Sequence, residues 1–362
     1  EEGRQRWIVG VGARAGGVVA LDAPFMTRGA RFGDDFEAAA VTIEPFGELA
    51  IEFADCSSGT VNYAATRAEI GSGSHAPLRL SRVAGAPCID GTPQTGSGMR
   101  WVERARLPGG NSSEHAVVAA GDYIYAIGGF GNLDGLRRYA PLEDRWDTLA
   151  PMPDGRHHLA GFAYDGALYA VGGYSESNEA YSPGFRFDLA NGTWSDVPEF
   201  LPSVASQGAL LHGRAFIGNL DATLQEYDPV SRRTRRIPLH FAPGARDHSQ
   251  VVAFLDEIWM IGGRSPEHAL VSIYNPARDE WRRGPRMNHP RGGFAAAVSG
   301  NRIMVAGGEF LEPNPRSVSA TAEVYTAGEL VWGTAPDMPV AMHGNPAVSW
   351  NGRLFVVSGS LV

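Results

Sequence analysis

A pair of glycines closes an apolar run of residues about every 44 to 51 residues through most of this chain. The clear copies are Gly128-Gly129, Gly172-Gly173, Gly262-Gly263 and Gly307-Gly308. Two weaker copies, around Gly218 and at Gly359, fill the remaining intervals, so six units run from about residue 101 to residue 362. Repetition at such a period indicates a stacked-repeat architecture rather than one continuous core.

Each unit carries a second landmark, an aromatic residue on one short strand followed by a tryptophan on the next. The pairs are Tyr139 and Trp146, Phe187 and Trp194, Tyr274 and Trp281, and Tyr325 and Trp332. These rings supply large, rigid apolar area between adjacent sheets. The third unit keeps Tyr227 but has Thr234 near the tryptophan position, so we expect its sheet to be the least well packed.

The landmarks predict four short strands in each unit, the first two joined by a tight turn such as Asp165-Gly166. A single four-stranded sheet cannot bury both of its faces, and radial repetition of such sheets solves this while leaving only short edges. We therefore predict an all-β chain, with a β-propeller over residues 96–362 and a small β-domain over residues 1–95.

The double glycine with spaced tyrosine and tryptophan resembles the kelch repeat, over about residues 101–362. The resemblance implies a six-bladed kelch-type propeller. Trp101 resembles part of a fourth strand without its first three, while the chain ends after a second strand, so we expect the N-terminal strand to complete the sixth blade. No third strand for that blade follows Gly359, so either residues before Trp101 supply it or the C-terminus is cut short.

Residues 1–95 alternate like β-structure but lack the repeat. Stretches such as RWIVGVG and FGELAIEFADCSSGTVNY resemble a small β-domain of secreted bacterial proteins. That resemblance implies further strands before Glu1, and the missing initiator methionine agrees with an upstream signal peptide, more domain, or both. Both cysteines, Cys56 and Cys88, lie here, which favours a disulfide and an oxidising compartment over two buried thiols.

Charge and hydropathy argue against two classes of partner. The 31 basic residues are all arginine, and a net charge of −9 disfavours nucleic acid. No apolar run approaches the roughly 20 residues of a membrane helix, so no transmembrane segment is predicted. The local run Arg232, Arg233, Arg235 and Arg236 fits a solvated blade edge better than a binding site.

Any chemistry is expected where loops from all blades converge around the central channel. Aligned by their glycine pairs, the units place histidines at equivalent positions and arginines two residues earlier. The histidines are His115, His158 and His248, with His343 one place off, and the arginines are Arg156, Arg246 and Arg291. Tyr174 lies beside them, in a long polar loop of the kind that concentrates ligand contacts.

This ring of arginine and histidine has two interpretations. Arginine presents a planar fork of donors that matches a carboxylate or sulfate, so the ring would bind an acidic ligand. The kelch resemblance implies instead that these side chains hydrogen-bond the carbonyls of neighbouring loops.

Several enzyme classes are constrained by the residues present. The propeller contains no cysteine, so the tyrosine–cysteine cofactor of kelch-type copper radical oxidases cannot form. The Glu-x3-Asp-x3-His iron pattern of kelch specifier proteins is also absent from the sequence. His115, His158 and His248 are conceivable metal ligands, but equivalent positions on separate blades tend to encircle the channel. We therefore predict neither a metal nor a cofactor.

A kelch mutarotase of the periplasmic, sialic-acid type is a further alternative. Anomer interconversion needs an acid and a base, together with a cation for the carboxylate. Glu309 with His158 or His248 would be adequate as the acid and base, and Arg246 or Arg291 as the cation.

The leading expectation is a secreted, periplasmic or cell-surface bacterial propeller without catalytic activity. Its loop-rich face would bind a protein or a glycan, acidic glycans included. The alternatives are the sugar-acid mutarotase and a structural subunit of an extracellular assembly, which would self-assemble through blade edges and the small domain.

If Cys56 and Cys88 form a disulfide, a thiol assay on the denatured chain will find no free thiol before reduction and both thiols afterwards. The Cys56→Ser variant will expose one thiol, because the partner of Cys56 is then released. Two free thiols in unreduced chain purified under oxidising conditions would contradict the pairing.

Overall fold

The computed structural model describes residues 7–15, 18–28, 41–53, 59–75, 99–177, 179, 184–201, 205–221, 223–239, 246–264, 268–310 and 317–361. Internal contacts divide the chain into two compact units, Glu1–Gln94 and Thr95–Val362. All the regular elements in the described ranges are strands, and no helix there has the length and hydropathy that crossing a bilayer requires.

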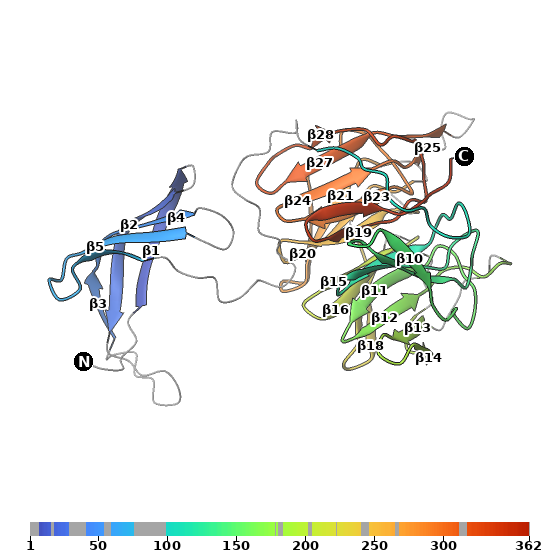
Figure 1. Cartoon of the computed structure of the whole chain (residues 1–362), viewed down its shortest axis with the longest axis horizontal. Coiled ribbons are helices and arrows are strands. Elements are labelled where there is room, and N and C mark those ends of the chain that lie inside the picture. The colour runs from blue at the N-terminus through green and yellow to red at the C-terminus, as the bar shows by residue number, and fades with distance from the viewer. Residues whose placement is uncertain are drawn as a thin grey trace. The chain divides into compact units, whose positions relative to one another are not determined.

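The first unit contains one antiparallel sheet of six strands (Figure 1). They are β1 (Trp7–Ala15), β2 (Val18–Arg28), β3 (Thr42–Pro45), β4 (Gly47–Phe53), β5 (Gly59–Ala65) and β6 (Ser72–His75). Their order is β1-β2-β4-β5-β6, and β3 pairs with β2. Cys56 and Cys88 lie outside the described residues, so their disulfide stays a prediction.

The second unit repeats a four-stranded antiparallel sheet five times and then adds a two-stranded one; we call these sheets blades 1 to 6. Blade 1 comprises β7 (Ala116–Ala120), β8 (Tyr123–Ile127), β9 (Leu136–Ala140) and β10 (Arg145–Thr148); blade 2 comprises β11 (Ala160–Tyr164), β12 (Ala167–Val171), β13 (Gly184–Asp188) and β14 (Thr193–Val197). Blade 3 comprises β15 (Ala205–Leu211), β16 (Arg214–Asn219), β17 (Leu224–Asp228) and β18 (Arg233–Ile237); blade 4 comprises β19 (Gln250–Phe254), β20 (Glu257–Ile261), β21 (Val271–Asn275) and β22 (Glu280–Arg283). Blade 5 comprises β23 (Ala295–Ser299), β24 (Arg302–Ala306), β27 (Ala322–Thr326) and β28 (Gly333–Ala335), with a ribbon of β25 (Glu309–Phe310) and β26 (Ser317–Val318); blade 6 comprises β29 (Ala347–Trp350) and β30 (Arg353–Val356).

The first strands of the six blades form a closed ring. In chain order, β7, β11, β15, β19, β23 and β29 each contact the next, and β29 contacts β7. This closure confirms the predicted six-bladed propeller (Figure 1). The predicted turn at Asp165-Gly166 joins β11 to β12, and both residues have positive φ, as a type I′ turn requires.

The aromatic landmarks pair across neighbouring strands of one blade. Tyr139 lies opposite Trp146, with ring centroids 4.9 Å apart, and the equivalent pairs of blades 2, 4 and 5 lie 5.0, 5.1 and 5.6 Å apart. Three of the indole N–H groups donate to a backbone carbonyl in the segment before their blade. These bonds join Trp146 to Ala105, Trp194 to Ala150 and Trp332 to Pro285. Each of these hydrogen bonds therefore links a blade to the segment that precedes it.

Trp101 provides the same bond for blade 6. Its indole N–H donates to the carbonyl of Pro336 at 2.8 Å, in the segment before that blade, and its ring packs against the core cluster that contains Ala297 and Met338. The N-terminal segment of the unit thus closes the ring, as expected. Residues 99–107 contain no strand, however, so the expected fourth strand is not formed. The N–H and C=O groups of Ala105 bond instead to the side chains of Asp144 and Trp146.

Blade 3 keeps this design without a tryptophan. Thr234 lies opposite Tyr227, and its hydroxyl donates to the carbonyl of Glu199, in the segment before the blade. Tyr227 is only 1% exposed and packs against Phe200. The expectation of loose packing here is therefore wrong, because Tyr227 is as buried as the equivalent residues of the other blades, which are 0–7% exposed.

The basic run lies on and beside β18, the last strand of blade 3, where acidic side chains surround it. Arg235 pairs with Glu226 and Asp279, and Arg236 pairs with Asp221. These arginines thus form ion pairs along a solvated blade edge, as the sequence favoured.

The Trp101→Ala variant will lose about 3 kcal/mol of unfolding free energy, because a large ring and the bond that closes the propeller are both removed. Urea unfolding followed by circular dichroism will measure this loss. Val102 is 56% exposed, so Val102→Ala should change stability by less than about 0.5 kcal/mol. Equal stability of the two variants would show that the ring closes without Trp101.

Candidate functional site

In five blades, one residue at the same position has a left-handed backbone conformation. It directly follows the residue that forms a β-bridge with the residue after the glycine turn. We call these residues the mouth ring. They are Glu114, His158, His248, Gly293 and Gly344, with φ values of 54°, 56°, 57°, 60° and 57°. The equivalent segment of blade 3 lies outside the described residues. Left-handed φ is unusual for residues other than glycine, so the fold imposes this conformation on three of them.

Backbone hydrogen bonds link the mouth ring from blade to blade. The amide of Glu114 donates to the carbonyl of Gly344 at 2.9 Å, and the amide of His158 donates to the carbonyl of Glu114 at 2.7 Å. Gly293 donates to His248 at 3.0 Å, and Gly344 donates to Gly293 at 2.6 Å. These bonds hold the blades together at the channel mouth and turn the side chains of the ring inwards.

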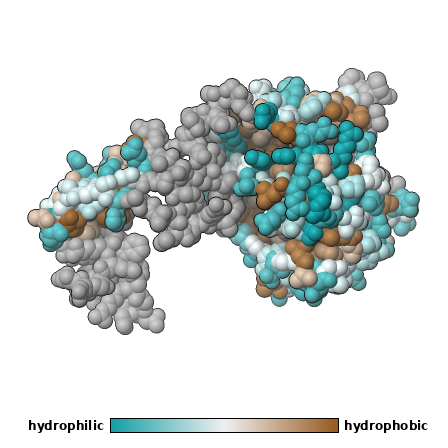
Figure 2. All heavy atoms as spheres, in the orientation of Figure 1, coloured by the Kyte–Doolittle hydropathy of each residue, from teal (hydrophilic) through white to brown (hydrophobic). Residues whose placement is uncertain are grey.

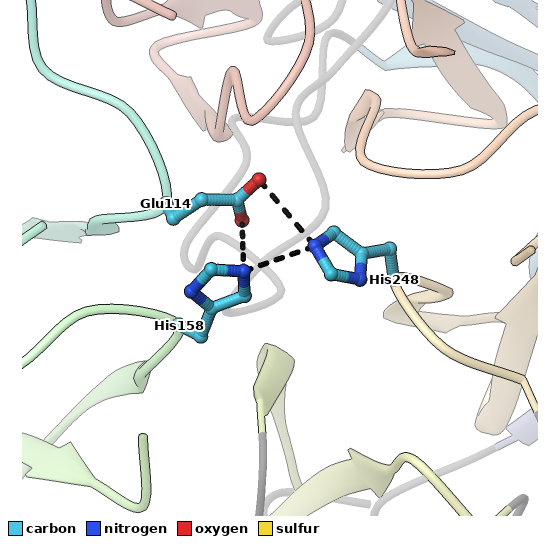
Figure 3. A group of neighbouring side chains, drawn as sticks. All are labelled: Glu114, His158 and His248. Carbon is cyan, nitrogen blue, oxygen red and sulfur yellow. Dashed lines mark hydrogen bonds and ion pairs between the residues drawn. The ribbon is translucent and has the colours of Figure 1, made fainter. Parts of the chain in front are cut away.

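The side chains of Glu114, His158 and His248 converge on one point from three different blades (Figure 3). His158 Nε2 lies 3.0 Å from His248 Nε2. Glu114 Oε1 lies 3.5 Å from His248 Nε2, and Glu114 Oε2 lies 3.8 Å from His158 Nε2. One potential metal-binding atom of each residue therefore lies within 4.8 Å of the other two.

A second layer of polar groups orients these imidazoles. Asp247 Oδ1 lies 2.5 Å from His248 Nδ1, and its Oδ2 accepts from Arg264 Nε at 2.8 Å. Arg264 also pairs with Glu309. On the other side, His157 Nδ1 lies 2.5 Å from His158 Nδ1. Both cluster histidines thus use Nδ1 for support and point Nε2 towards the centre.

The charges of the cluster are strongly coupled. Burial would raise the pKa of Glu114, but His248, His158 and His343 together hold that pKa well below its ordinary value. Burial would lower the pKa of His248, but Glu114 and Asp247 raise it to about 9. Burial lowers the pKa of His158 to about 4. In the metal-free protein at neutral pH, a carboxylate and an imidazolium therefore face a neutral imidazole.

A small cavity of about 40 Å³ adjoins the cluster and is lined by ring residues together with His115, Phe294 and Asn345. A water molecule needs about 10–15 Å³ on this scale, whereas pockets for small organic ligands measure about 300–1,000 Å³. Glu309 is fully buried, pairs with Arg264, and lies 3.5 Å from His343 Nδ1. This cavity therefore has room for water or an ion, but not for a sugar ring.

Comparison with known proteins agrees with this architecture. The Kelch motif family matches residues 112–153 and 155–201, which contain blades 1 and 2. The solved structure of YjhT superposes with a TM-score of 0.61 and 15% identity, covering 71% of this chain and 92% of that one. The second unit therefore has a kelch-type β-propeller fold.

Relatives of the kelch propeller occur in longer proteins. Kelch-like protein terF of Aspergillus terreus is 26% identical over 280 residues, covering 69% of this chain and 61% of that protein. Kelch-like protein 21 of Mus musculus is 28% identical over 268 residues, covering 71% and 42%, and alpha-scruin of Limulus polyphemus is 26% identical over 247 residues, covering 61% and 27%. The chain thus spans less than two thirds of the length of each of these relatives.

The three predicted arginines of the kelch propeller are buried beneath its glycine pairs. Arg156 and Arg291 are 0% exposed, and Arg246 is 1% exposed. Each donates to the carbonyl of the first glycine of its own blade, which is Gly172, Gly307 or Gly262 respectively. In blade 1, Arg137 on β9 donates to Gly128 instead. These guanidinium groups bind loop carbonyls, so the ligand-binding interpretation of the arginines finds no support in their geometry.

The predicted histidines separate into two groups. His158 and His248 meet, and His343 approaches Glu114 to 3.8 Å. His115 is not equivalent to them; it is 3% exposed, and burial and Arg137 lower its pKa to about 3. The equivalent residue of blade 1 is Glu114, which the sequence alignment missed by one position. Counting 15 residues back from the second glycine of each pair would have found it.

Tyr174 lies where the sequence placed it, at the mouth of blade 2. Its ring contacts His157 and His158, with both centroid separations at 5.7 Å.

The Arg246→Ala variant of the kelch propeller will lose about 3 kcal/mol or more of unfolding free energy, because several buried carbonyls lose a charged donor. Chemical unfolding will measure it. Arg233 is exposed on β18, so Arg233→Ala should leave stability within about 0.5 kcal/mol of the parent. A stable Arg246→Ala variant that lost affinity for an acidic ligand would instead restore the ligand-binding interpretation.

Proposed function

We propose that the kelch propeller is a non-catalytic binding module that recognises a protein partner at its mouth face. A protein-binding role without catalysis is what kelch repeats suggest, and the two clearest repeats build the part of the mouth described next. The observation that carries the proposal is an exposed aromatic side chain that is held rigidly beside the mouth ring.

This side chain is that of Phe130, which follows the glycine pair of blade 1 and is 44% exposed. It stacks on His157 of blade 2, with centroids 4.1 Å apart and planes inclined by 22°. His157 is only 2% exposed and contacts Tyr174 on blade 2. We call Phe130, His157 and Tyr174 the aromatic platform.

The platform has the features of a binding anchor. Backbone bonds between Phe130 and Ser113, and between His157 and Tyr174, fix its base. A rigid aromatic surface provides contact area with little loss of side-chain entropy, and such residues dominate the energetics of protein interfaces. On the face shown in Figure 2, the surface of the propeller is mixed in hydropathy, with apolar and polar residues side by side.

The geometry gives less support to the sugar-acid mutarotase. Glu309, proposed as one member of its acid–base pair, is buried and paired with Arg264, and its proposed cations, Arg246 and Arg291, are buried against carbonyls. The cavity of about 40 Å³ would not admit a sugar acid. Binding at the surface of the mouth therefore fits these residues better than catalysis inside it.

Peptide display against the intact chain, with the Phe130→Ser variant as the counter-selection target, tests the proposal. Peptides recovered in this way should lose at least about fivefold in affinity for Phe130→Ala by titration calorimetry, because an interface anchor contributes more than about 1 kcal/mol. Leu142 lies in the same blade and is 84% exposed, so Leu142→Ala is the matched control and should bind normally.

A glycan array with acidic sugars, followed by NMR measurement of anomer exchange, covers the alternatives. Glycan binding that depends on Phe130 would make the partner a glycan rather than a protein. Accelerated anomer exchange would replace the binding module with an enzyme. High-order oligomers of the purified chain would favour a subunit of an extracellular assembly, and a secreted or periplasmic location remains a proposal tied to the Cys56–Cys88 pairing.

A further inference from the structure

We propose that Glu114, His158 and His248 bind one divalent transition-metal ion, of the Zn²⁺ or Fe²⁺ class, at the centre of the propeller mouth. Two imidazoles and one carboxylate are a donor set that zinc and non-haem iron both use, with the remaining coordination positions open to water. This inference is independent of what binds to the aromatic platform.

The distances between the donor atoms fit a metal ion. Bonds of about 2.0–2.1 Å at tetrahedral angles separate neighbouring donors by about 3.3 Å. The three separations here, between His158 Nε2, His248 Nε2 and the Glu114 oxygens, are 3.0, 3.5 and 3.8 Å. Each donor comes from a different blade, and Figure 3 shows the three pointing at a common centre.

The surrounding groups supply the support that metal-binding histidines require. A ligating imidazole almost always donates its other N–H to a carboxylate or another acceptor, which fixes its tautomer. Asp247 holds His248 in this way through Nδ1, at 2.5 Å. His157 holds His158 through the same ring atom, also at 2.5 Å. The nitrogen that faces the centre is Nε2 in both cases.

The local charge also fits a dication. The described groups within ion-pair distance of the cluster, or of its direct partners, include the carboxylates of Glu114, Asp247 and Glu309 and one guanidinium, that of Arg264. When the histidines are neutral, as metal ligation requires, these groups leave an excess of two negative charges. A divalent ion would balance that excess.

Gly344 keeps the space around Glu114 open. A Cβ at Gly344 would lie 2.6 Å from Glu114 Oε1, closer than a real Cβ atom approaches. The adjoining cavity of about 40 Å³ can hold the water molecules that complete the coordination of a metal ion.

Arg264 is the group that must adjust. Its Nη2 lies 3.1 Å from His248 Nε2, so the guanidinium must move away when that nitrogen binds a cation. It can withdraw without becoming unpaired, because Asp247 and Glu309 both remain its partners.

Titration calorimetry of the EDTA-treated intact chain with Zn²⁺ alone tests the site. We expect one equivalent to bind and the temperature of unfolding to rise, because the ion joins three blades. Glu114→Gln should weaken binding by more than about 100-fold, and Asp247→Asn by about 10–100-fold, the range for loss of an outer-shell partner. His212 is exposed and lies outside the cluster, so His212→Ala should bind as the parent does.

X-ray absorption of the zinc-loaded parent chain needs no variant and identifies the ligands directly. Two imidazole nitrogens with oxygen ligands at about 2.0–2.1 Å support the site, whereas sulfur at about 2.3 Å would place the zinc on Cys56 and Cys88 and overturn it. No binding by the parent chain, or equal affinity in a folded Glu114→Gln variant, would also overturn it.

Discussion

A buried guanidinium beneath each glycine pair is the contact on which the mouth of this propeller depends. The first glycine directly follows the second strand of its blade, and leaving its carbonyl buried and unsatisfied would be costly. Arg246 satisfies Gly262 in this way, and Arg291 satisfies Gly307. In blade 1 the donor comes from another strand, as Arg137, yet the bond to Gly128 is the same. The constraint therefore acts on the carbonyl, and the position of the arginine in the sequence is secondary.

The mouth ring follows from this constraint. Once the glycine turn is held, the residue before the ring bridges to the residue after the glycines, and the next residue adopts a left-handed conformation. This conformation has a cost for Glu114, His158 and His248, and the backbone bonds between blades offset it. Because their Cβ atoms then face the axis, ionisable groups from three blades are forced together. Glycine at the other two described positions leaves room for them.

Much of the fold could be predicted from the sequence because glycine pairs and Tyr/Trp pairs mark local geometry. The closure through Trp101 could also be predicted, since Trp101 resembles the tryptophans at the ends of the other repeats. Its indole forms the same kind of bond to a backbone carbonyl. The sequence left the roles of the arginines open between a ligand and a loop carbonyl, because the same residue binds a ligand when exposed and a carbonyl when buried. Glu114 was missed because the alignment followed histidine identity to His115, whereas the structure follows backbone conformation. Thr234 shows the same limit, since its hydroxyl replaces an indole that the pattern required.

His157 is part of the aromatic platform on the surface, and it also contacts the cluster of Glu114, His158 and His248 inside the mouth. Its Nδ1 contacts Nδ1 of His158, while its ring face supports Phe130. Both contacts depend on the position of one imidazole, which the backbone pair with Tyr174 holds at its base. A rotation of His158 would disturb the first contact, and a matching shift of His157 would disturb the stack. The order of the interior cluster therefore helps to keep the ring of Phe130 rigid. A side chain that is already rigid loses less conformational entropy on binding, which lowers the free-energy cost of binding a partner.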